Sequence, residues 1–155
     1  MKGSPEVIAG LRAAAALEAH LNLQSRLDAR TLSYMGVKKV VKKLKWIGDD
    51  AHCFLKKVVD RALFLGGDPS YDVAPVSEQA GLTAMLNNTL ALEMAIVAPY
   101  EQQVQVCMKA LDDASRNLYE HLLKWHQKHV GWLEQQLRLI DAIGEEEYIA
   151  EKLSR

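Results

Sequence analysis

Four polar residues occur at positions where the helical pattern of this sequence otherwise places apolar side chains. Glu18 and Glu93 each fall seven residues after a leucine of such a stripe, and His126 and His129 lie one helical turn apart. Carboxylates and imidazoles that converge inside a helix bundle are common ligands of divalent transition metals. The spacing favours a buried metal site, although an exposed Glu18 and ordinary hydrogen bonds of the histidines also fit it.

The elements that must position these residues are long helices, since apolar residues recur at steps of three and four and no alternating strand pattern competes. A connection with two prolines over residues 66–76 separates the second helix from the third. This arrangement predicts an all-α bundle of four helices with one long crossover, formed by a single domain over residues 1–155. The apolar stripes cover residues 5–34, 40–65, 82–111 and 118–140, and a short fifth helix is expected at 145–153.

Signals for helix ends flank these stripes. Ser4 and Pro5 are expected at the N-cap and the first position of the first helix, and Asp112 or Asp113 is expected to cap the fourth. Gly36 and Gly144 are expected to end the first and fourth helices, because glycine readily adopts the left-handed conformation that follows a helix.

The composition narrows the class of protein. The 155 residues are 49% apolar and 25% charged, with a formal net charge of -1. This overall charge does not indicate nucleic acid as a partner. The opening MKGSPEVIAG lacks the apolar run of a signal peptide, and no segment resembles a membrane span. Cys53 and Cys107 are too few for a disulfide framework, and Cys107 falls on an apolar stripe. We therefore expect a cytoplasmic protein.

Several segments, in order and almost without gaps, resemble bacterioferritin over essentially the whole chain. They are MKG at the start, Glu18, Ala29-Arg30, Gly36, RALFLGGDP at 61–69, LALE at 90–93, HVGWLE at 129–134 and LIDAIGEEEY near the end. The resemblance implies a ferritin-like four-helix bundle with a long crossover between helices 2 and 3, a short C-terminal fifth helix and a role in iron storage.

The resemblance also implies a di-iron ferroxidase centre, whose ligands are a glutamate from helices one and three and Glu-x-x-His from helices two and four. Glu18, Glu93 and His129 match this pattern. Ala51 and Phe54 stand where helix two should supply glutamate and histidine, and His126 stands where helix four should supply glutamate. Both carboxylates that would bridge the irons are therefore missing, and a standard dinuclear centre is not expected.

Two readings of the remaining cluster stay open. Glu93, His126 and His129, with Glu18 nearby, form a 2-His-1-carboxylate set that can hold one Fe(II) or Zn(II) ion. Alternatively, His126 pairs with Glu18 or Glu93 and no metal binds. Asp49-x-x-His52 does not replace the lost ligands, because these residues lie off the buried stripe of their helix.

His52 stands at the position where the resemblance places the methionine that ligates haem b on a dimer two-fold axis. Histidine is a strong axial ligand, which favours haem at His52, whereas the polar neighbours Asn22, Arg26 and Asp49 argue against it. The other interpretation is a surface or dimer-interface histidine that binds no haem.

The opening of the second helix is rich in lysine. The resemblance would turn Lys39, Lys43, Trp46 and Asp50 toward the lumen of a cage, where a basic lining attracts phosphate or other anions; a solvated face is the simpler reading.

The leading prediction is thus a bacterioferritin-like cage subunit without a complete ferroxidase centre. The resemblance implies an assembly of 24 subunits, either homo-oligomeric or hetero-oligomeric with a competent subunit. The alternatives are a mononuclear metalloprotein built on the 2-His-1-carboxylate set and a purely structural or anion-binding cage.

Overall fold

The computed structural model describes residues 2–153, and within them it contains helices and connections but no strand. The four long helices and the short fifth one confirm the expected all-α architecture, with boundaries within a few residues of the apolar stripes. The helices are α1 (Pro5–Tyr34), α2 (Lys38–Phe64), α3 (Leu82–Lys109), α4 (Asp113–Ile143) and α5 (Glu145–Lys152).

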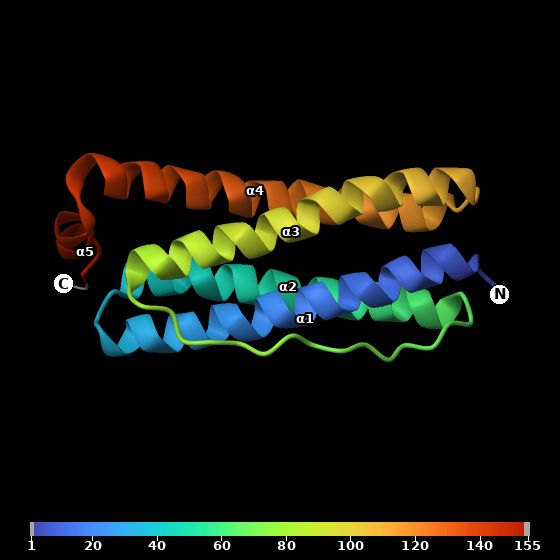
Figure 1. The fold of residues 1–155 in the computed structure, drawn as a ribbon, viewed down its shortest axis with the longest axis horizontal. Coiled ribbons are helices and arrows are strands. Elements are labelled where there is room, and N and C mark those ends of the chain that lie inside the picture. Colours follow the sequence, from blue (N-terminus) through green and yellow to red (C-terminus); the bar gives the residue numbers. More distant parts are fainter. Residues whose placement is uncertain (1, 154–155) are drawn as a thin grey trace.

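The bundle consists of two antiparallel helix pairs, α1 with α2 and α3 with α4, joined by a crossover that runs along α1 (Figure 1). Side chains of α1 bind the backbone of this crossover. Arg12 donates from Nε to the carbonyl of Ser70 at 2.8 Å. Gln24 donates to the carbonyl of Ser77 at 2.8 Å and accepts from its amide at 3.0 Å. The crossover is therefore an extended strap that lets α3 return beside α1.

The helix ends agree in part with the sequence signals. Asp112 caps α4, because its side chain accepts from the amide of Ser115 at 3.0 Å. Gly36 and Gly144 have φ values of +80° and +84°, which confirms their roles after α1 and α4. Ser4 and Pro5 occupy the N-cap and the first turn of α1 as expected, but the Ser4 side chain makes no capping hydrogen bond.

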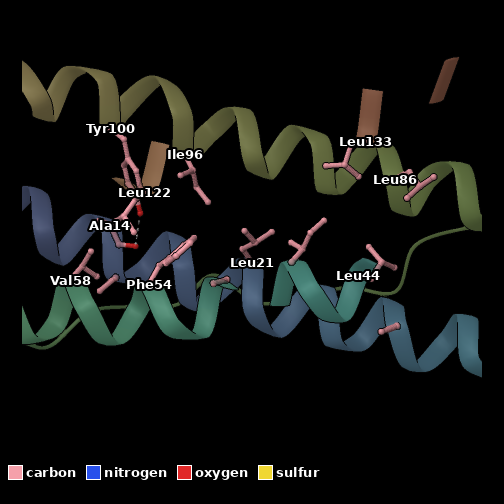
Figure 2. Packing of buried hydrophobic residues seen from close by; sticks show 14 of the residues in the cluster. Ala14, Leu21, Leu44, Phe54, Val58, Leu86, Ile96, Tyr100, Leu122 and Leu133 are labelled. Carbon is pink, nitrogen blue, oxygen red and sulfur yellow. Dashed lines mark hydrogen bonds between the residues drawn. The ribbon is translucent and has the colours of Figure 1, made fainter. Parts of the chain in front are cut away.

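The core runs the full length of the bundle and comes from all five helices. Figure 2 shows Phe54 on α2 and Tyr100 on α3 pointing into this interior, where Leu122 of α4 also packs. Cys107 is a buried thiol, and burial raises its pKa to about 11. In the described part of the chain, no helix is both long enough and apolar enough to cross a bilayer.

Candidate functional site

The four polar residues of the core stripes meet at mid-height of the bundle. Glu18 comes from α1, Glu93 from α3, and His126 and His129 from α4, and all four side chains are buried. Because a buried charge is tolerated only when it is paired, the contacts among these groups decide what the site can do.

His126 bridges the two glutamates. Its Nδ1 lies 2.6 Å from Oε2 of Glu93, and its Nε2 lies 2.7 Å from Oε2 of Glu18. Ionised carboxylates only accept hydrogen bonds, and the pKa of His126 is raised to about 10, so both of its ring nitrogens carry a proton. The side chain of His126 is therefore an imidazolium held between two carboxylates.

His129 extends this arrangement toward the surface. Its Nδ1 lies 2.7 Å from Oε1 of Glu93, and its Nε2 lies 2.7 Å from Oδ2 of Asp50 on α2. The ring of Trp46 packs edge-on against His129, with ring centroids 4.6 Å apart. The Asp50 side chain is 24% exposed, so the chain of hydrogen bonds reaches solvent at this end.

At the other end, Tyr100 completes the network. Its hydroxyl donates to Oε2 of Glu18 at 2.7 Å, while Oε1 of Glu18 is buried without a hydrogen-bond partner among the described residues. Burial raises the pKa of Tyr100 well above its ordinary value, which keeps this hydroxyl a donor. One continuous chain thus links Tyr100, Glu18, His126, Glu93 and His129, and it ends at the partly exposed carboxylate of Asp50 on α2.

The electrostatics agree with a charged His126. Burial lowers the pKa of this imidazole, but the charge of Glu18 and the hydrogen bonds to both glutamates outweigh burial and raise the pKa to about 10. Burial raises the pKa of Glu93, and its hydrogen bonds to His126 and His129 outweigh that effect, so the pKa is lowered. Burial dominates at Glu18 and raises its pKa, with the imidazolium of His126 opposing it. His126 and Glu93 therefore form the ion pair in which both partners keep their charges.

The second-helix positions of a dinuclear centre hold apolar side chains. Ala51 and Phe54 are both buried, and the Phe54 ring packs edge-on against His126, with centroids 5.3 Å apart. The ring nitrogens of His126 and His129 all contact carboxylates, and among the described residues of this network only Oε1 of Glu18 lacks a hydrogen-bond partner. The residues present do not fit a di-iron centre.

A smaller set keeps metal-binding geometry. Glu93, His126 and His129 each offer a ligand atom, and these three atoms lie within 4.8 Å of one another. A metal ion at this point would have to replace carboxylate contacts of both histidines and remove a proton from the charged His126, since coordination needs neutral imidazole.

His52 and Asp49 lie apart from this cluster. Both are exposed on α2, and Asp49 accepts from Arg26 of α1 at 2.9 Å, while Arg26 also donates to Asn22 at 2.8 Å. This placement agrees with the expectation that Asp49-x-x-His52 does not supply core ligands. His52 thus lies on an exposed face of α2, on the same helix as Asp49, which pairs with Arg26.

Sequence reasoning missed Asp50 and Tyr100 as parts of the network. Tyr100 lies seven residues after Glu93, so helical periodicity already placed both on one face. Asp50 was expected only as a residue turned toward the lumen of a cage. Asp50 could have been identified from its position next to the buried Ala51, at the edge of the core face of α2.

A four-helix bundle with a long crossover and a carboxylate–histidine cluster in its core is typical of ferritin-like proteins. Comparison with known proteins agrees with this class. Residues 8–143 match the ferritin family model, described as a ferritin-like domain. The chain belongs to this family, within which its named relatives are bacterioferritins and bacterial ferritins.

The relatives match the chain nearly end to end. A bacterioferritin of Brucella melitensis is 32% identical over 149 residues, which are 96% of this chain and 92% of the relative. A bacterial ferritin of Synechocystis is 28% identical over 156 residues, covering 99% of this chain and 100% of the relative. A bacterial ferritin of Neisseria meningitidis is 30% identical over 82% of this chain and 83% of its own.

Proposed function

We propose that this chain is a bacterioferritin-type shell subunit of iron storage whose own helix bundle does not oxidise iron rapidly. The observation that carries this proposal is the state of the two core histidines. All four of their ring nitrogens bind carboxylate oxygens at 2.6–2.7 Å, so the imidazolium of His126 supplies the positive charge that iron supplies in a metal centre.

This arrangement stabilises the bundle without metal. Buried carboxylates destabilise a fold unless a cation neutralises them, and His126 does so from within the same chain. Ala51 and Phe54 fill the remaining space with apolar groups, which removes the carboxylate that would be needed to bridge two cations. Iron is therefore stored cargo for this subunit and is not bound by a catalytic centre inside it.

Fe(II) added to the purified protein under air should give only a slow rise of ferric absorbance. We expect no fast phase that saturates at about two irons per chain, because no bridging carboxylate is present. A bacterioferritin with all six ligands, measured beside it, is the control. A fast saturating phase in the homomeric protein would contradict the proposal.

A mononuclear metal site is the second candidate function, and the convergence of Glu93, His126 and His129 favours it. Metal analysis of anaerobically purified protein separates the two candidates. About one iron or zinc per chain, lost in His129→Ala, would support the mononuclear site. A metal content well below one per chain supports the closed hydrogen-bonded network.

We further propose that the subunits form the closed shell of 24 chains expected for bacterioferritin, alone or together with a ferroxidase-competent subunit. The nearly end-to-end match to bacterioferritins supports this assembly. Light scattering of the same preparation should give the mass of a closed shell, and monomers or isolated dimers would contradict it.

Haem at His52 is a separate proposal, in which two copies of His52 would be axial ligands across a two-fold axis. The exposure of His52 supports this role, while the ion pair of Arg26 with Asp49 makes the rim more polar than a haem site prefers. Bound haem would supply one-electron redox chemistry.

Reconstitution with haem should give a low-spin bis-imidazole spectrum at about half a haem per chain, and His52→Ala should abolish it. His121→Ala, which changes another exposed histidine, is the matched control and should leave the spectrum intact. Absence of a Soret band in the unmutated protein would leave His52 without a haem role.

A further inference from the structure

A small basic pocket lies at the end of the bundle where α2 begins and α5 packs against α4. Its volume is about 200 Å³, and three lysines line it, Lys39 and Lys43 of α2 and Lys152 of α5. Trp132 and Tyr148 form part of its wall. The pocket is distinct from the core network, and nothing in the iron-storage proposal uses it.

The three ammonium groups have no acidic partner among the described residues, since no ion pair within 4.0 Å involves them. Lys43 lies 5.2 Å from the ring centroid of Trp46, and Lys152 lies 5.4 Å from that of Tyr148. Aromatic faces hold these ammonium groups without neutralising them. The positive charge of the pocket is thus available to a ligand.

A buried amide supplies a further donor. Gln136 is 7% exposed, lines the pocket, and accepts from the hydroxyl of Tyr148 at 2.7 Å through Oε1. Burial raises the pKa of Tyr148 to about 12, so this hydroxyl stays protonated and fixes the orientation of the amide. The Nε2 group of Gln136 makes no hydrogen bond to any described residue, so this pocket-lining side chain keeps a donor free for a ligand.

The lining of an adjacent hollow differs in charge from that of this pocket. It shares Lys39 but is otherwise lined by Glu147, Ala150 and Glu151, so its charge is mixed. The 200 Å³ pocket combines three cationic donors with one amide and has no carboxylate in its lining. A compact, multiply charged oxyanion satisfies more of these donors than a monovalent anion does.

We propose that Lys39, Lys43, Lys152 and Gln136 form a binding pocket for a phosphate group. Phosphate offers several strong acceptor oxygens, which match the several donor side chains lining the pocket, and its charge balances the unpaired lysines. None of these residues belongs to the core network of the bundle. Phosphate binding can therefore be measured on iron-free protein, separately from any iron chemistry.

Calorimetric titration of the purified iron-free protein with inorganic phosphate tests the site. We expect a Kd of about 1 mM or tighter at low ionic strength. Lys39→Gln/Lys43→Gln should weaken binding by about tenfold or more, because two ammonium groups at the ligand are lost. AMP, titrated in parallel, identifies the source of the phosphate group: tighter binding assigns the pocket to a phosphate ester, and weaker or equal binding to the free anion.

The matched control is Lys38→Gln/Lys42→Gln. It removes the same charge at the same spacing from exposed positions one residue away on α2, outside the lining of the pocket. We expect its phosphate affinity to stay within about twofold of the unmutated protein. An equal loss in both variants would show a diffuse basic surface, and no saturable binding in the unmutated protein would show that no site exists; either result overturns the proposal.

Discussion

Ala51→Glu/Phe54→His/His126→Glu should give this protein rapid Fe(II) oxidation that saturates at about two irons per chain. The three changes restore the two bridging carboxylates and the second histidine. The other three ligands, Glu18, Glu93 and His129, are already buried at one height of the bundle. We expect the initial rate of Fe(II) oxidation under air to rise by at least about tenfold.

The matched control carries neutral side chains at the same positions, as Ala51→Gln/Phe54→Asn/His126→Gln. It adds polarity to the same places but supplies no bridging charge, so its oxidation should stay slow. Because the metal-free ferroxidase variant buries several like charges, its thermal midpoint should be low and should rise on addition of Zn(II). A folded variant that binds Zn(II) but shows no fast phase would contradict the expectation.

His126→Ala should lower the free energy of unfolding by about 3–5 kcal/mol, since it leaves two buried carboxylates without their cation. Urea denaturation followed by far-UV circular dichroism measures the change. His121→Ala, an exposed histidine on the same helix, should change stability by no more than about 0.5 kcal/mol. Glu18→Gln in the His126→Ala background should recover part of the loss, because it removes one of the unpaired charges.

The stabilisation by His126 should also depend on pH in a defined direction. Its pKa is raised from 6.5 to about 10 in the folded chain. Below pH 6.5 both folded and unfolded His126 are protonated and the contribution is complete; it falls as pH rises and is lost above about 10. The stability gap between the unmutated protein and His126→Ala should therefore narrow between these limits. A gap of constant size would show that packing, not charge, accounts for the loss.

Much of this protein could be predicted from its sequence, because helical periodicity is a local property of the chain. The stripes located the four long helices within a few residues, and two prolines after Gly66-Gly67 marked the crossover. The same periodicity placed Glu18, Glu93, His126 and His129 on core faces, and all four are buried. The loss of the glutamate and histidine ligands at Ala51 and Phe54 could also be predicted, since it depends on residue identity alone.

The partners of those core groups depended on the tertiary structure, because hydrogen bonds between helices are set by packing and not by spacing along one helix. Only the packed bundle brings Glu18 and Glu93 to opposite nitrogens of His126, and only it brings Asp50 of α2 to His129 of α4. The unpaired lysines of α2 and α5 likewise meet in one pocket only after α5 folds back against α4. The sequence alone determined which chemical groups enter the core, and the fold decided that a charged histidine neutralises the carboxylates there.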